Sequence, residues 1–261
     1  MYEEWEITIP ELTGDETRRA CVYVPDEAQY DPDARFPVLY MFDGQNLFFD
    51  EQATYGKSWG MLSYLSSNNI PLIIAALECS HHAEDEPCGG RLSEYSPFSF
   101  NDSDWGSITG RGQLTMDYIV NEFKPLIDEN YPTLPRRRYT FIGGSSMGGL
   151  MTIYALMRYN NVFSRGAALS PSLEFSFEDI MDMIEGSKTG RTHLYMDNGS
   201  KEMLSAKRKR AYAEVAAALI KKGIFLESRI VAGGTHSEGS WQRQVPFFIE
   251  ALFYNLQIQK A

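Results

Sequence analysis

The stretch RYTFIGGSSMGGLMTIYALMRY, residues 138–159, sets two adjacent serines between two pairs of glycines. The residues before the glycines, 138–142, are β-branched and aromatic, which predicts a strand. Those after them, from Leu150 to Met157, place apolar side chains at helical spacing, which predicts a helix. A strand that turns through glycines directly into a helix is the setting in which Gly-x-Ser-x-Gly holds a nucleophilic serine. Only one frame fits this pattern, and it puts Ser146 at the centre.

The glycine spacing has a steric reason. A serine held in a strained backbone conformation needs neighbours two positions away that lack side chains, because chain segments cross there. In this frame those neighbours are Gly144 and Gly148, whereas a frame centred on Ser145 puts Met147 in place of the second glycine. The helix that follows favours developing negative charge at its N-terminus. We therefore predict that Ser146, and not Ser145, is a nucleophile.

The composition is that of a globular chain long enough to bury a substantial core, and we expect residues 1–261 to form a single domain. The formal net charge of −11 argues against nucleic acid and against an anionic membrane surface as the main partner. The longest strongly apolar stretch, residues 70–77, is too short to span a bilayer. With no visible secretory signal in MYEEWEITIP and only three cysteines, we expect a cytoplasmic protein.

Segments with strand character alternate with helical ones over the later part of the chain. We expect strands at 4–10, 18–25, 37–43, 71–78, 138–144, 164–170, 192–197 and 225–232. Helical periodicity falls at 58–66, 112–129, 147–160, 203–222 and 241–256. No helix separates the first two strands, so we expect them to pair antiparallel at an edge of a mostly parallel sheet of about eight strands, flanked by helices. Ligands of such sheets lie at the carboxyl ends of the strands.

A serine hydroxyl needs a base, usually a histidine, and the histidine needs an acceptor that fixes its tautomer. His236 follows the last expected strand in a glycine-containing loop, at the same edge of the sheet as Ser146. Hydrolases with this strand arrangement order their residues as serine, acid and histidine, so the acid lies between the two. Asp197 at the end of an expected strand and Glu202 in the following turn both meet this condition, and position alone does not separate them.

Six blocks of the sequence carry a family resemblance: MFDGQNLF (41–48), RLSEYSPF (91–98), IDENYPTLP (127–135), FIGGSSMGGLMTIYALMRYNNVF (141–163), LSPSL (169–173) and GGTHSEGSW (233–241). Together they resemble the putative esterase family of α/β hydrolases, which includes esterase D, enterochelin esterases, feruloyl and acetyl-xylan esterases and the mycolyltransferases. The resemblance implies an α/β-hydrolase fold. Relatives carry Gly-Thr-x-Asp/Glu where this chain has Gly-Ser-Lys-Glu at 199–202, so the resemblance favours Glu202 as the acid.

A tetrahedral intermediate needs N–H donors aimed at its oxyanion. We expect one donor to be the backbone amide of Met147, which follows the nucleophile. The other is expected from Gln45, where Gly44 lets the chain turn after the third strand. The same Asp-Gly-Gln-Asn segment, residues 43–46, is similar to the siderophore-esterase branch of the family.

The segment 79–111 is long for a connection and has little periodicity, as is typical of lids and binding loops. We expect it to form a long active-site loop, whose candidate substrate-binding residues are Arg91, Trp105 and Arg111. The cysteines and histidines of residues 79–88 match no standard zinc spacing, so we expect no metal ion.

These patterns predict a serine hydrolase that cleaves carboxylic esters through an acyl-enzyme, with a small-molecule ester as its partner and no metal or organic cofactor. The loops expected at the catalytic edge carry more acidic than basic residues, which favours small or sugar-linked acyl and hydroxycinnamoyl esters over strongly anionic ones. The family resemblance supplies an alternative, an esterase for siderophore trilactones of the enterobactin type. An acyltransferase and a non-catalytic binding protein on the same fold are further alternatives.

Overall fold

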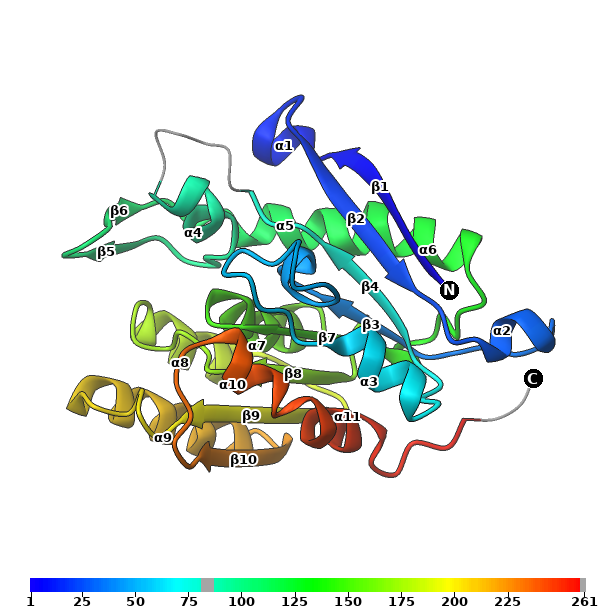
Figure 1. Ribbon diagram of the computed structural model, residues 1–261. Helices are drawn as coiled ribbons and strands as arrows, with labels where there is room; N and C mark the ends of the chain where they lie inside the picture. Colours follow the sequence, from blue (N-terminus) through cyan, green and yellow to red (C-terminus); the bar gives the residue numbers. More distant parts are fainter. Residues whose placement is uncertain (81–86, 259–261) are drawn as a thin grey trace.

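An eight-stranded sheet forms the centre of the protein in the computed structural model, which describes residues 1–80 and 87–258 (Figure 1). The strands lie in the order β1-β2-β4-β3-β7-β8-β9-β10. They are β1 (Tyr2–Thr8), β2 (Thr17–Tyr23), β3 (Val38–Met41), β4 (Ile73–Leu77), β7 (Thr140–Ser145), β8 (Arg165–Leu169), β9 (His193–Gly199) and β10 (Phe225–Val231). β2 pairs antiparallel with both β1 and β4, and the other neighbours pair parallel. The expected sheet, with its antiparallel edge, is confirmed.

The inner strands are apolar along their whole length because both faces of the sheet are covered. Along β3, Val38 and Tyr40 point into one apolar core, whereas Leu39 and Met41 point into the other. Helices α5, α7, α8 and α9 supply side chains to the first core, and α3, α10 and α11 supply them to the second. This alternation is what a buried parallel strand requires, and it produces the two helical layers of an α/β-hydrolase fold.

The helices follow the expected segments with some differences in their bounds. They are α1 (Pro10–Thr13), α2 (Glu27–Tyr30), α3 (Met61–Ser67), α4 (Arg91–Glu94), α5 (Gly112–Tyr118), α6 (Lys124–Asn130), α7 (Met147–Arg158), α8 (Phe177–Gly186), α9 (Ala206–Lys221), α10 (Glu238–Gln242) and α11 (Val245–Phe253). Short 3₁₀ turns form at η1 (Gly44–Asn46), η2 (Pro87–Gly89) and η4 (Arg137–Tyr139). No helix in the described part of the chain is long and apolar enough to cross a membrane.

Two expected helices are interrupted, and prolines lie at both interruptions. The helix expected at 112–129 contains a π-helical turn, η3 (Ile119–Phe123), which ends just before Pro125. The helix expected near the C-terminus is two helices, the second of which has Pro246 in its first turn. Proline has no N–H for the helical hydrogen-bond ladder, and it is therefore tolerated where a helix begins anew. Helix α8 was not expected, although Ile180, Met183 and Ile184 have helical spacing and are buried.

The strand order places the carboxyl ends of β3 and β7 at the point where the chain changes direction across the sheet. From β3 the chain passes to β4 on one side, and it then crosses to β7 on the other side of β3. In open parallel sheets such a switch point leaves a crevice outside the strand ends, because the connections on either side of it run apart. Gly44, Gln45 and Ser146 all follow these two strands, so the topology brings them to one crevice.

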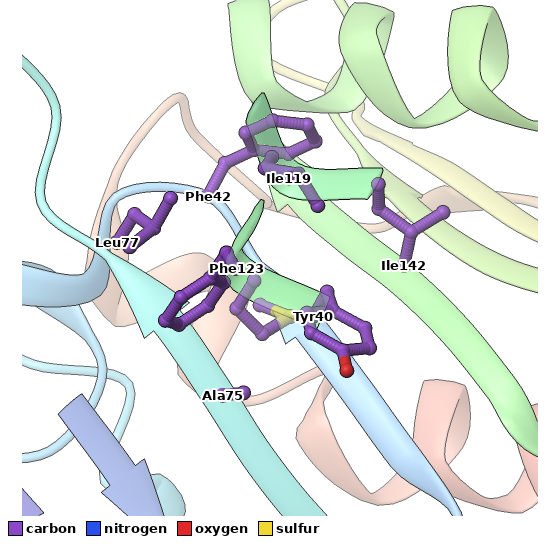
Figure 2. Close-up of a pocket in the computed structure, with 8 residues that line it drawn as sticks. Tyr40, Phe42, Ala75, Leu77, Ile119, Phe123 and Ile142 are labelled. Atoms are coloured by element: carbon purple, nitrogen blue, oxygen red, sulfur yellow. The ribbon is translucent and has the colours of Figure 1, made fainter. Parts of the chain in front are cut away.

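A small cavity lies inside the first apolar core and is not a ligand site. It is surrounded by aromatic and aliphatic side chains, among them Tyr40, Phe42 and Phe123 (Figure 2). Its volume is about 10 Å³, which is about the space that one water molecule needs. The π-helical turn η3 contributes Ile119 and Phe123 to its lining, so the wider turn is part of the core packing.

The expected loop 79–111 contains structure of its own, and a buried ion pair fixes it to the sheet. It holds η2, α4 and a hairpin of β5 (Phe100–Asp102) and β6 (Gly106–Ile108). Arg18 of β2 donates from Nη1 to both carboxylate oxygens of Glu94 in α4, at 2.7 and 2.8 Å. The Ser80 N–H donates to the same carboxylate at 3.0 Å. Arg18 and Glu94 thus hold the segment that carries Arg91 against the antiparallel edge of the sheet.

We expect Arg18→Leu to lower the free energy of unfolding by about 3–5 kcal/mol, because it leaves the buried Glu94 carboxylate without its cation. Urea denaturation monitored by circular dichroism measures the loss. Arg136→Leu is the matched control, since Arg136 is exposed and should change stability by about 0.5 kcal/mol or less. A loss below about 1 kcal/mol for Arg18→Leu would show that this ion pair does not anchor the loop.

Candidate active site

Ser146 lies in a tight turn between β7 and α7, in a backbone conformation that side-chain-bearing residues seldom adopt. Its φ and ψ are 58° and −120°, at the N-cap of α7. A Cβ on Gly144 would lie 3.0 Å from the Gly148 carbonyl carbon, and a Cβ on Gly148 would lie 3.0 Å from the Phe42 Cβ. The glycines on either side therefore let three chain segments approach within van der Waals distance. The frame centred on Ser146 matches this geometry, and Ser145 is the last residue of the buried strand.

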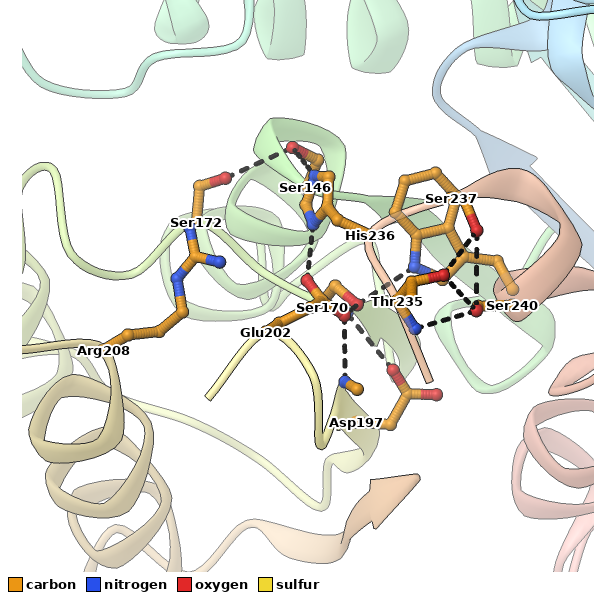
Figure 3. A network of polar contacts seen from close by, with 12 residues as sticks. Ser146, Ser170, Ser172, Asp197, Glu202, Arg208, Thr235, His236, Ser237 and Ser240 are labelled. Atoms are coloured by element: carbon orange, nitrogen blue, oxygen red, sulfur yellow. Dashed lines mark hydrogen bonds and ion pairs between the residues drawn. The ribbon is translucent and has the colours of Figure 1, made fainter. Parts of the chain in front are cut away.

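His236 lies beside Ser146, in the loop between β10 and α10. Its Nε2 is 2.9 Å from the Ser146 Oγ (Figure 3). The Thr235 N–H donates to the Ser240 Oγ at 3.0 Å, which ties the loop to the helix after it. The Trp241 ring meets the imidazole edge to face, with centroids 5.0 Å apart. The loop is thus held so that the imidazole faces the serine.

Glu202 lies just past the end of β9, in a turn that Gly199 closes. The Gly199 N–H donates to Glu202 Oε1 at 2.9 Å, and the Glu202 N–H donates to the Gly199 carbonyl at 3.0 Å. A Cβ on Gly199 would lie 2.4 Å from the Gly234 carbonyl oxygen, so only glycine lets this turn lie against the histidine loop. Glu202 Oε2 is 2.6 Å from His236 Nδ1. The structure thus brings Ser146, His236 and Glu202 into one hydrogen-bonded row.

The Glu202 carboxylate is buried, and several hydrogen-bond donors contact it. Its Oε1 also accepts a hydrogen bond from the Ser170 Oγ at 2.8 Å, and Ser170 in turn accepts one from the Trp241 indole N–H at 3.0 Å (Figure 3). Burial by itself would raise the pKa of Glu202, but the hydrogen bonds from His236 and Ser170 outweigh it and lower the pKa below its ordinary value. The carboxylate therefore stays ionised at neutral pH.

Asp197, the other candidate acid, takes part in a different network. It lies within β9, and its carboxylate accepts hydrogen bonds from the Tyr195 hydroxyl at 2.9 Å and the Ser170 N–H at 3.2 Å. Burial raises its pKa to about 6, although both hydrogen bonds act in the opposite direction. No hydrogen bond joins Asp197 to His236 among the described residues. Asp197 thus supports Ser170 and does not contact the imidazole.

The two expected oxyanion donors lie on the two chain segments that meet at Gly148. Met147 is the first residue of α7, where helical N–H groups have no partner within the helix. Gln45 lies in the η1 turn, and its side-chain amide donates to the Cys79 Sγ at 3.2 Å. The Phe42 Cβ lies close to Gly148, so the end of β3 approaches the start of α7 directly. This contact puts the turn that carries Gln45 near the Met147 amide.

Asp43, which precedes this turn, is held by three polar contacts. Its φ of 57° lies in the left-handed region, where a residue other than glycine is strained. Arg91 donates to both carboxylate oxygens of Asp43, from Nε and Nη2, at 2.7 Å each. The Asp43 N–H donates to the Tyr95 hydroxyl at 3.2 Å. Helix α4 and the residue after it thus fix the turn that carries Gln45.

An open pocket of about 800 Å³ surrounds Ser146 and His236. Arg91 lines this pocket, as expected, but Trp105 and Arg111 are not among its lining residues. Trp105 lies at the turn of the β5–β6 hairpin, and the Arg111 guanidinium donates to the Glu11 carbonyl, which turns it toward α1. Both residues therefore lie outside the described lining of this pocket, and their expected role in substrate binding stays a prediction. His81 and His82 lie outside the described residues.

Two serines and a glutamate of the site were not singled out from the sequence. Ser172 Oγ lies 3.3 Å from Ser146 Oγ, and the Ser172 N–H donates to the Ser146 carbonyl at 3.1 Å. Ser170 supports Glu202, and Glu238 lines the pocket. The blocks LSPSL and GGTHSEGSW contain all three residues, but nothing in those blocks indicates which side chains face the site.

Comparison with known proteins assigns the chain to a family. A model of the putative esterase family matches residues 13–256, so the chain belongs to this family and is a carboxylic ester hydrolase. An uncharacterized Bacillus subtilis protein, YbbA, is 28% identical over 193 residues, which cover 71% of this chain and 69% of that protein.

Solved structures share the fold at low sequence identity. An IroE-like serine hydrolase from Shewanella oneidensis superposes with a TM-score of 0.75 at 20% identity, over 99% of this chain and 82% of that one. The enterobactin esterase FES from Shigella flexneri, solved in the presence of enterobactin, gives a TM-score of 0.72 at 18% identity. That match covers 98% of this chain and 60% of the FES chain. These likenesses agree with the α/β-hydrolase fold.

Proposed function

We propose that the protein is a serine esterase in which Ser146 is the nucleophile, His236 the general base and Glu202 the acid that orients the histidine. The observation that carries the proposal is the row of hydrogen bonds from Glu202 through His236 to Ser146, with distances of 2.6 and 2.9 Å. Because the ionised Glu202 accepts from Nδ1–H, the Nε2 lone pair faces the serine hydroxyl, as proton abstraction requires.

The reaction proceeds in two halves. Ser146 Oγ forms a bond to the ester carbonyl carbon while its proton passes to His236 Nε2, and the backbone amides of Met147 and Gln45 donate to the oxyanion. When the intermediate collapses, the bond from carbon to the alcohol oxygen breaks and His236 gives its proton to the leaving alcohol. Water then attacks the acyl-enzyme as His236 takes one of its protons. The bond between the carbonyl carbon and Ser146 Oγ then breaks, His236 returns the proton to Ser146 Oγ, and the carboxylic acid leaves.

The substrate that we propose is a small or sugar-linked acyl or hydroxycinnamoyl ester without strong negative charge. Both arginines in the described lining of the pocket are already paired with carboxylates, Arg91 with Asp43 and Arg19 with Glu78. A third carboxylate, that of Glu238, lines the same pocket. An anionic ester would therefore meet more carboxylates than guanidinium groups, and neither guanidinium group is unpaired.

Ser146→Ala should abolish both ester hydrolysis and covalent labelling by a fluorophosphonate, because it removes the attacking oxygen. Ser145→Ala is the matched control and should leave the label on Ser146. Mass spectrometry of the labelled peptide separates the two serines. An adduct on Ser145 in the unaltered protein would contradict the assignment.

Glu202→Gln should lower kcat on the order of 10²- to 10⁴-fold with little change in the unfolding midpoint, because the histidine loses the charge that orients it. Asp197→Asn should cost much less, since Asp197 does not contact the imidazole. Steady-state kinetics on one aryl ester measures both variants. The reverse ranking would move the acid to Asp197, and small effects from both would indicate a serine–histidine dyad.

The charge of the substrate is tested by comparing kcat/KM for an enterobactin-type trilactone with kcat/KM for acetyl and feruloyl sugar esters at low ionic strength. We expect the sugar esters to be preferred, because the paired arginines offer little attraction for an anion. A preference for the trilactone of about ten-fold or more, which corresponds to about 1.4 kcal/mol, would instead establish the siderophore alternative.

A further inference from the structure

Glu238 is a buried carboxylate in the lining of the candidate active-site pocket, and none of the described lining residues pairs with it. It is the first residue of α10, two positions after His236, and only 6% of its surface is exposed. No hydrogen bond or ion pair joins its side chain to another of the described residues, and the only hydrogen bond it accepts is from its own backbone amide. The other acidic residues of the described lining, Asp43 and Glu78, are each paired with an arginine.

An unpartnered buried carboxylate is costly to a folded protein unless something else donates to it. Burial raises the pKa of Glu238, and the nearby charge of Asp43 raises it further, whereas His236 and Arg91 act in the opposite direction. Asp43, His236 and Arg91, which also line the pocket, are the ionisable groups that act on Glu238. The Glu238 carboxylate therefore lies among the groups that surround a bound ester, where a ligand can supply the missing donor.

The other polar side chains of the pocket lining indicate which kind of donor fits. Asn46, Gln52, Thr54 and Tyr55 line the same pocket, and their amides and hydroxyls suit uncharged polar groups. Arg91 lies close enough to act on the Glu238 charge, and it would oppose a second cation there. A hydroxyl group can donate to Glu238 and also accept from another polar group of the lining. An ammonium group can only donate, so the lining favours a hydroxyl.

We propose that Glu238 determines substrate specificity by accepting hydrogen bonds from hydroxyl groups on the alcohol part of the ester, as found in polyol and sugar esters. The alcohol part is the relevant one because His236, which in the proposed mechanism protonates the leaving alcohol, lies in the loop that leads directly into α10, two residues before Glu238. The inference rests on the proposed serine esterase function. It adds a residue that distinguishes hydroxylated from plain alkyl esters.

The test compares glycerol 1-acetate with propyl acetate, which have the same acyl group and the same three-carbon chain but differ in two hydroxyls. The measured quantity is kcat/KM for glycerol 1-acetate divided by kcat/KM for propyl acetate. In Glu238→Ala this ratio should fall about ten-fold or more, because hydrogen bonds to a charged acceptor are among the stronger ones. Glu238→Gln, which keeps one acceptor oxygen and the shape of the side chain, should give an intermediate ratio.

Glu250→Ala is the matched control, because Glu250 is an exposed carboxylate on α11 and should leave the ratio unchanged. Fluorophosphonate labelling of Ser146 in each Glu238 variant checks that the catalytic residues are still assembled. An equal loss on both esters, or an unchanged ratio, would overturn the proposal, since a merely structural role does not distinguish hydroxyls. Absence of labelling and hydrolysis in the unaltered protein would instead refute the serine esterase function, and with it this inference.

Discussion

The close contact of chain segments at the β7–α7 turn is the constraint on which the site depends. Gly148 lies against Phe42 at the end of β3, and Gly144 lies against Gly148 itself, so no side chain fits between them. This contact lets Ser146 adopt its strained conformation and brings the turn with Gln45 toward the start of α7. A larger residue at either glycine would separate the proposed nucleophile from the proposed oxyanion donors at the same time.

A second close contact between glycines brings together the two segments that carry the acid and the histidine. Gly199 touches Gly234, and this contact holds the turn of Glu202 against the loop of His236. Ser170 and Trp241 then complete the hydrogen bonds around the carboxylate. The hydrogen bonds from Glu202 through His236 to Ser146 thus depend on close backbone contacts at Gly148 and at Gly199. These contacts fix the positions from which the three side chains extend.

The buried ion pairs near the pocket act mainly by holding chain segments in place, and they contribute little to its electrostatic potential. Arg18 with Glu94 holds α4 against the sheet, and Arg91 of that helix holds Asp43, which precedes the Gln45 turn. Each pair is close to neutral, so these charges position the chain and contribute little net potential. Glu238 differs from them because none of the described residues pairs with its carboxylate, and for that reason it is the group that we connect with the substrate.

The sequence by itself determined the eight strands of the central sheet, the order of the proposed catalytic residues along the chain and the choice of Ser146 over Ser145 as the centre of the Gly-x-Ser-x-Gly motif. These features depend on local patterns, since apolar alternation and glycine spacing act within a few residues of the chain. The sequence also reduced the candidates for the acidic residue that orients His236 to Asp197 and Glu202, and the family resemblance favoured Glu202. Only the tertiary structure shows that the Asp197 side chain takes part in another network while the turn after β9 aims Glu202 at His236. The pairing of Arg91 with Asp43 and the direction of Arg111 toward α1 were likewise decided by contacts between distant segments. No local pattern encodes such contacts, because the direction of a loop side chain depends on which segment packs against it.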